Sequence, residues 1–405
     1  MPKSWVVTCL INFLIASLMG LLLRLSNVTA LGFEYAKMIH AHSHTAMLGW
    51  VYMMIYGLFV HHFVPSDKRK KYSLLYWLTQ LTVIGMMVSF PVQGYALFSI
   101  IFSTLHIVCS YILCYRIWKD NNARNPAGLF LRTAIIFMLA STLGAWSVGI
   151  AMNLAGKDSA LYQVAIQFFL HFQFNGWFVF SILSIFFDIL RKHGIALKEN
   201  TLHAFYYTMV FSAIVTFALP VSWYFPSRTL FFINVIGVAL QAVSLVYFFR
   251  LTASHRQAFF SKNMGPKWLL GLSLISFATK VIMQAVTVFP AFALASHAVR
   301  NFTIGFIHLG MLGVISGFLF FFLTVDGFQI RHNAVFKSGL VVFYTGFLLT
   351  ESILFCQGML QFLRLSLIAK YDEILLGATF LLPIGLALII VAIFKRYPKY
   401  DLSHI

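Results

Sequence analysis

Three histidines at one end of a long apolar run have the clearest chemical potential in this sequence. The segment "MIHAHSHTAMLGWVYMMIYGLF", residues 38–59, carries His40, His42 and His44. Imidazole dissolves poorly in hydrocarbon, and an ionisable side chain inside a membrane segment marks a functional site by default. Imidazole is also a common axial ligand of haem iron. We therefore ask which other histidines share this setting and which helices position them.

The composition places the chain in a lipid bilayer. Of its 405 residues, 60% are hydrophobic and 10% are charged, whereas soluble domains carry about 25% charged residues. The four cysteines lie in apolar runs, which predicts neither a disulfide framework nor a zinc site. The first apolar run is too long for the core of a signal peptide and no small-residue cleavage site follows it, so we expect a span there.

Apolar runs bounded by charge or proline predict twelve membrane-spanning helices, each needing about 20 residues. No linker or internal repeat is evident, so we expect an all-α polytopic membrane protein with one domain, residues 1–405. The predicted spans are near 5–23, 38–64, 74–90, 95–118, 129–154, 163–187, 203–223, 229–249, 268–289, 301–324, 338–360 and 373–394.

The basic residues predict the orientation of these spans. The net charge is +18, and 21 of the 29 Lys and Arg residues fall in segments on the side of the N-terminus, against 6 on the other side. Such a bias predicts that both termini are cytoplasmic. The positive charge is therefore a topology signal, and we expect no nucleic-acid partner, because no basic face interleaved with aromatic residues is evident.

Four histidines lie within predicted spans, and their depth is informative. At a rise of 1.5 Å per residue, His44 lies roughly 9 Å, and His171 and His308 roughly 11–12 Å, from the outer ends of their helices. His106 lies deeper. A haem clamped between two helices needs two imidazoles at one depth. We expect His44 and His308 to be those ligands.

Helical spacing puts His40 and His44 on one face and turns His42 away by about 200°. His40 would hydrogen-bond a haem propionate or simply lie at the membrane interface. Several glycines surround His308 in "NFTIGFIHLGMLGVISGFLFFFL". They would admit either a porphyrin plane or a neighbouring helix.

These motifs resemble subunit I of the haem-copper oxidases and nitric oxide reductases, most closely the C-type oxidases. "TIGFIHLGMLG", residues 303–313, is similar to their tenth helix, "HTAM" at 44–47 to their second, and "FFLHFQFNGWF" at 168–178 to their sixth. The resemblance implies twelve spans, His44 and His308 as axial ligands of a low-spin haem b, and His171 as a copper ligand.

The sequence departs from that family at the oxygen-reducing centre. The first histidine of the family's helix-ten pair is replaced by Phe306, its histidine pair on helix seven is missing, and Asn175 stands where some members have a tyrosine. The resemblance therefore implies one haem site without a full haem-copper centre. A looser resemblance to the haem- and copper-containing membrane proteins of the nitrosative-stress response fits the same residues.

The same resemblance implies the inner membrane of a bacterium, an electron donor such as a quinol or a cytochrome, and other respiratory subunits as partners. In the family, arginines between the last two helices contact haem propionates, so we expect Arg364, or alternatively Arg300, in that role. Lys280 and Glu351 are costly inside a membrane, and we expect them to pair if they are near each other. A proton path is the alternative.

Three functions remain open from the sequence. The first is a b-type haem protein for electron transfer or gas response. The second is an active oxidase or nitric oxide reductase with a non-standard second metal site that recruits His171 with His297 or His106. The third is a metal-free transporter or assembly scaffold. The catalytic residues of any such enzyme are not identified.

Overall fold

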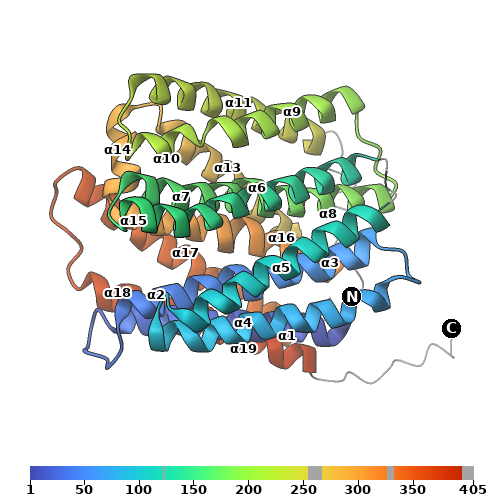
Figure 1. Ribbon diagram of the computed structural model, residues 1–405, viewed down its shortest axis with the longest axis horizontal. Coiled ribbons are helices and arrows are strands. Elements are labelled where there is room, and N and C mark those ends of the chain that lie inside the picture. The colour runs from blue at the N-terminus through green and yellow to red at the C-terminus, as the bar shows by residue number, and fades with distance from the viewer. Residues whose placement is uncertain (122, 124, 254–266, 326–332, 395–405) are drawn as a thin grey trace.

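The chain is an all-α membrane protein. The computed structural model describes residues 1–394 apart from positions 122 and 124 and segments 254–266 and 326–332, and no strand occurs within that part. Among these described residues, twelve helices are long and apolar enough to cross a membrane, which confirms the predicted number; Figure 1 shows how they are arranged. Several basic residues used to predict orientation, including Arg124, Arg256, Lys262, Arg331 and Lys395, lie outside the described residues.

Three spans form the centre of the bundle. In the most apolar stretch of the second, sixth and tenth spans, 83%, 89% and 72% of residues are buried, against 28–50% in each of the other nine. Each central span is built from three pieces. They are α2 (Tyr35–His44), η1 (Thr45–Tyr52) and α3 (Met53–Phe63); α7 (Ala160–His171), η3 (Phe172–Phe178) and α8 (Val179–Lys192); and α15 (Arg300–His308), η4 (Leu309–Ile315) and α16 (Ser316–Val325).

The middle piece of each central span is a π-helix, and each begins directly after a histidine: His44, His171 and His308. A π-helix shifts its hydrogen bonds to i→i+5, which changes the angular register of the side chains that follow, and such segments are frequent at functional sites. The three histidines share a similar depth in the predicted spans, but nothing in the residue pattern predicts the change of helix type.

The other nine spans surround the three central ones. They are α1 (Lys3–Leu25), η2 with α4 (Arg69–Tyr72, Ser73–Gln93), α5 (Leu97–Asp120), α6 (Pro126–Ala155), α9 with α10 (Glu199–Val215, Ala218–Ser222), α11 (Arg228–Ala253), α13 (Lys267–Val286), α17 (Ala334–Phe362), and α18 with α19 (Tyr371–Thr379, Leu381–Phe394). A short helix, α14 (Pro290–Ala298), precedes the tenth span.

These outer helices form three arcs. In the first, α17, α19 and α1 pack in succession, and α1 also packs on α2 and η1. In the second, α4, α5 and α6 follow one another and end on α7. In the third, α9, α11 and α13 follow one another and end on η4. Each arc therefore closes on a central span.

Two polar contacts hold the centre together. The Asn12 amide of α1 donates to the Gly49 carbonyl in η1 at 2.9 Å. Trp50 Nε1 donates to Ser316 Oγ at 2.8 Å, and that hydroxyl donates to the Met311 carbonyl at 2.7 Å. Because backbone groups in hydrocarbon must be satisfied by protein, these side chains stabilise η1 and η4 and link the second span to the tenth.

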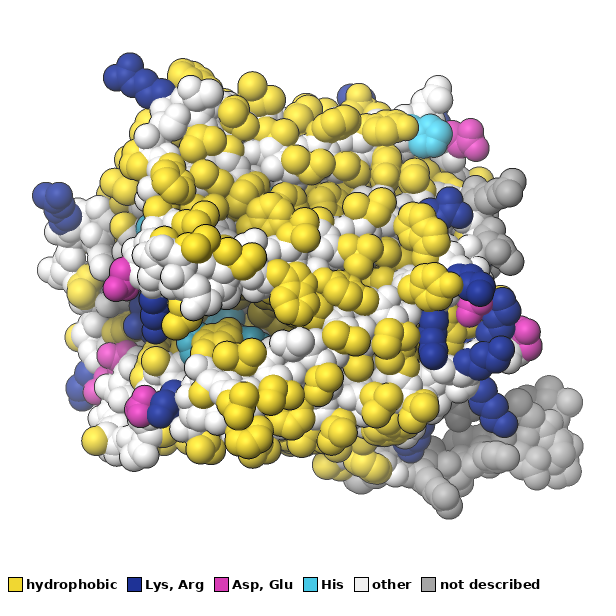
Figure 2. All heavy atoms as spheres, in the orientation of Figure 1, with side chains coloured by type: hydrophobic (Ala, Val, Ile, Leu, Met, Phe, Trp, Pro, Cys, Tyr) yellow, Lys and Arg dark blue, Asp and Glu magenta, His cyan; other side chains and the backbone are white. Residues whose placement is uncertain are grey.

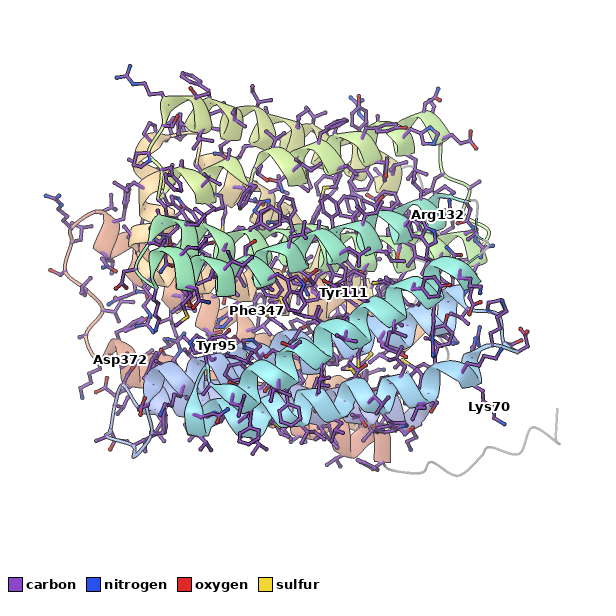
Figure 3. The ribbon with its side chains drawn as sticks, viewed as in Figure 1. Lys70, Tyr95, Tyr111, Arg132, Phe347 and Asp372 are labelled. Carbon is purple, nitrogen blue, oxygen red and sulfur yellow. The ribbon has the colours of Figure 1, made fainter. Side chains whose placement is uncertain are left out.

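The surface agrees with a membrane setting. Charged side chains lie near the two ends of the bundle, and the band between them is largely hydrophobic on the face in Figure 2. Lys70 and Arg132 mark one end in Figure 3, while Tyr95 and Asp372 mark the other. The three central histidines lie in the half of the bundle on the side of Tyr95, which is the predicted outer side.

Candidate functional site

The three histidines of α2 face two different neighbours. His40 and His44 lie on the side of α4: both rings contact Phe90 and Tyr95, and the His44 ring lies tilted against Phe90 with a centroid distance of 4.4 Å. His42 lies on the side of α1, where its Nδ1 is 2.8 Å from the Ala16 carbonyl. The predicted separation of the two faces is therefore observed.

His42 packs over a glycine of α1. A Cβ atom at Gly20 would lie 2.9 Å from Cε1 of His42, so only glycine leaves the imidazole in this position. The Nδ1–H of His42 donates to the Ala16 carbonyl, and this bond leaves Nε2 as the nitrogen with a free lone pair. A histidine held in this way by a backbone carbonyl is oriented for metal binding through Nε2.

His308 faces accessible space inside the bundle. Its side chain is 30% exposed although it lies in a central span, and its Nδ1 is 3.7 Å from Oε1 of Glu351 on α17. The groups in electrostatic range of His308 are Arg24 of α1 and His42. Of the second-span histidines, His42 is the one in electrostatic range of His308, whereas His44 is in range of His40 and His106.

Two arginines lie at the outer mouth of this space. Arg300 donates to the hydroxyl of Tyr35 and lies over its ring, which joins the outer ends of α15 and α2. Arg24 is in electrostatic range of Tyr35, Arg300 and Asp372. Arg364, in contrast, is exposed with a backbone φ of 56° in the loop before α18. Arg24 is thus in electrostatic range of His42 and His308, Arg300 lies beside Arg24 and Tyr35, and Arg364 has no such contact in the described structure.

Figure 2 shows a hollow with histidine side chains at its base, between the ends of α2 and α5 on one side and α7 and α15 on the other. Tyr95, labelled in Figure 3, lies beside it. The Tyr95 hydroxyl is 3.4 Å from Nε2 of His44.

The glycines around His308 serve mainly helix packing. Gly305 lies against Phe355 and Glu351 of α17, while Gly313 and Gly317 lie against Ser276 and Ser273 of α13. Of the two alternatives that the sequence left open at these positions, close helix approach is observed. Gly310 differs, because a Cβ atom there would meet only Cε of Lys280, at 4.0 Å.

The expected pairing of Lys280 with Glu351 is wrong. Lys280 Nζ donates to Asn175 Oδ1 at 2.7 Å and to Gln284 Oε1 at 2.9 Å, and Glu351 lies beside His308 instead. The two residues sit on different faces of the tenth span, so α15 and η4 separate them. Sequence spacing could not show this, because it does not specify which side of the tenth span each neighbouring helix covers.

His171 lies beside Lys280 and lines a cavity of about 380 Å³ between the sixth, ninth and tenth spans, to which the seventh and eighth spans and α14 also contribute. Its Nε2 donates to the Ala213 carbonyl at 2.8 Å, and its Nδ1 is 3.4 Å from the Asn175 amide nitrogen. Phe306 and His297 also line this cavity. His297 stacks on Trp223 at 4.9 Å, away from His171 on a separate short helix.

These residues do not fit a copper site. Within the described ranges, no group of three or more His, Cys, Asp or Glu side chains is arranged to hold a metal ion. Nε2 of His171 is engaged by a backbone carbonyl. His106 is buried with Nε2 unpaired, but its ring faces Tyr52 rather than His171.

Sequence reasoning missed two residues of the site beside His308. Arg24 was counted only as a basic residue outside the membrane, and His42 was set aside because it faces away from His40 and His44. Gly20 was the available signal for His42, since a glycine in a span often marks close approach of another group.

No family model matches this sequence, and no curated protein matches it significantly.

Proposed function

We propose that this protein binds one b-type haem between its second and tenth spans, with His308 as one axial ligand and His42 as the other. The observation that carries the proposal is that His308, inside a central span, is 30% exposed and lies in electrostatic range of His42 and Arg24. The contacts favour His42 over His44, the ligand suggested by the family resemblance. His44 remains the rival to be tested.

The surrounding residues fit such a group. The carbonyl of Ala16 orients His42, and the carboxylate of Glu351 lies beside Nδ1 of His308. Both arrangements direct Nε2 of an imidazole away from the helix that anchors it. Arg24 and Arg300 at the outer mouth would neutralise the two propionates of a haem, because a guanidinium pairs well with a carboxylate.

A haem in this site would supply a one-electron ferric–ferrous couple. Two imidazole ligands fill both axial positions, so a gas could bind only by displacing one of them. We therefore favour electron transfer over gas response. We further propose a place in the inner membrane of a bacterium, with a quinol or a cytochrome as the electron donor and other respiratory subunits as partners.

An active oxidase or nitric oxide reductase is the weaker proposal. It would need a second metal ligand set in the cavity beside His171. The described residues nearest that place are His171, Lys280 and Phe306. Nε2 of His171 is hydrogen-bonded to a backbone carbonyl, and its Nδ1 lies 3.4 Å from the amide nitrogen of Asn175. An ammonium repels a cationic metal, and a phenyl ring cannot bind iron.

Metal and haem analysis of the purified protein tests these proposals together. We expect one iron and one haem per chain, with no copper, after expression in haem- and copper-replete cells. One haem plus stoichiometric copper would favour the oxidase or reductase. A colourless, metal-free preparation would refute the haem proposal and favour a transporter or scaffold.

A further inference from the structure

The cavity between the sixth, ninth and tenth spans is separate from the space beside His308. It is lined by Phe306 and Gly310 of the tenth span, and His308 is not among its lining residues. Its volume of about 380 Å³ falls within the range of small-molecule sites, roughly 300–1,000 Å³. The haem proposal leaves this cavity without a role.

A buried ammonium group lies at the cavity wall. Lys280 is 4% exposed, and its Nζ donates to the neutral amide oxygens of Asn175 and Gln284. No carboxylate of the described residues lies within ion-pair distance of this nitrogen. The Phe306 ring centroid is 5.2 Å away, which adds a cation–π contact but no hydrogen-bond acceptor.

Such a group is incomplete without a further partner. An ammonium has three N–H donors, and protein acceptors engage two of them here. A lysine inside a membrane is costly and is normally paired with an acceptor or lines a functional cavity. The third donor therefore calls for an oxygen acceptor, and the adjoining space is the cavity.

Most of the remaining wall area is apolar and much of it aromatic, including Phe174, Phe302, Phe355 and Trp223, although polar side chains such as Thr287 also line it. A small inorganic anion would leave most of that apolar area without a partner. A ligand that fits both parts has an apolar body and an acceptor oxygen at one end. The wall residue Gly310 keeps the approach to Lys280 open, because a side chain there would project toward its Cε.

We infer that this cavity binds a membrane-soluble organic molecule that presents an acceptor oxygen, either a carboxylate or a quinone carbonyl, to Lys280. The shared chemistry is an apolar body with one oxygen that accepts a hydrogen bond from the ammonium. Fatty acids and lipid-soluble quinones are the two sources of that chemistry in a bilayer. No electron transfer to the ligand is part of the inference.

Binding to the detergent-solubilised full chain tests it, with cis-parinaric acid as the carboxylate probe and decylubiquinone as the quinone probe. Quenching of tryptophan fluorescence reports occupancy, since Trp223 lines the cavity. Lys280→Met removes the ammonium at similar volume, and Gly310→Leu fills the approach. The matched controls are Lys267→Met and Gly271→Leu; Lys267 is exposed, and a Cβ at Gly271 would meet nothing within 4 Å.

We expect at least one probe to bind saturably and each cavity variant to weaken it by about tenfold or more, the loss typical of one charge-assisted hydrogen bond. Both controls should bind as wild type. If the binding of only one probe depends on Lys280, that probe identifies whether the natural ligand is a fatty acid or a quinone. Absence of saturable binding by both probes, or unchanged affinity in a folded Lys280→Met or Gly310→Leu protein, would overturn the inference.

If Lys280→Met does not fold, Gly310→Leu alone carries the test, because it leaves the ammonium and its two amide partners in place. The readout does not require haem. A colourless protein that binds a probe through Lys280 would refute the proposed haem function and leave this inference standing. A haem protein that binds neither probe would overturn this inference and leave the haem function standing.

Discussion

Nδ1 of His308 lies 3.7 Å from Oε1 of Glu351, and neither carboxyl oxygen of Glu351 has a hydrogen-bond partner in the described structure. A buried carboxyl group without a partner is costly. A small rotation of either side chain would bring the imidazole N–H into hydrogen-bond range. This relationship suggests that Glu351 positions His308, and four predictions follow from it and from its surroundings.

Glu351→Gln should raise the midpoint potential of the haem. A carboxylate beside Nδ1–H makes the imidazole a stronger donor and favours ferric iron. The amide removes that effect, and we expect a rise of roughly 60 mV, the one-electron equivalent of a tenfold change. Redox titration followed by absorbance measures it. Glu373→Gln, an exposed acid on α18, is the control, and equal shifts in both variants would contradict a specific role.

Gly20→Ala should displace His42. The new Cβ would lie 2.9 Å from Cε1 of the imidazole, so the ring must rotate and lose its hydrogen bond to Ala16. We expect a lower haem content and a mixed-spin absorption spectrum. Gly149→Ala, where a Cβ would meet nothing within 4 Å, should retain the wild-type spectrum. A normal low-spin spectrum in Gly20→Ala would argue against His42 as a ligand.

Arg24→Ala should lower the haem midpoint potential. A positive charge near the iron disfavours the ferric state, and Arg24 is in electrostatic range of both His308 and His42. We expect a fall of roughly 60 mV, whereas Arg364→Ala should change the potential little, because Arg364 is exposed in a loop. The opposite ranking in redox titrations would restore the sequence-based assignment of Arg364.

Trp50→Phe should loosen the contact between the second and tenth spans. It removes the hydrogen bond from Nε1 to Ser316, and interhelical hydrogen bonds in membranes contribute about 0.5–1.5 kcal/mol. Thermal denaturation in detergent should show a lower midpoint than in Trp146→Phe, whose indole bonds Tyr111 at the periphery. If the two variants melt together, the central contact contributes nothing distinctive.

The sequence was sufficient for the architecture. Runs of apolar residues predict all twelve spans because the bilayer sets their length, and the observed helices differ from those predictions by a few residues at most ends. The two faces of α2 also follow from helical geometry alone. His40 and His44 contact Phe90, and His42 contacts α1, as the 3.6-residue period requires.

The sequence was insufficient for the choice between those faces. A helical period says which side chains diverge, but not which side of α2 meets the tenth span. That choice depends on how α17, α19 and α1 pack in the first arc. For the same reason Lys280 and Glu351, which looked like partners, lie on different sides of α15. The π-helical turns after His44, His171 and His308 were also beyond reach, since no residue pattern used here distinguishes them from α-helix.

The most direct test of the account is the low-temperature electron paramagnetic resonance and absorption spectra of the oxidised protein and of three variants. We expect the wild type to show one low-spin ferric haem with two imidazole ligands. His308→Ala and His42→Ala should each lose that signal, and His44→Ala should keep it. Loss of the low-spin signal in His44→Ala with retention in His42→Ala would contradict the proposed pair, and a wild type without any haem signal would contradict the account as a whole.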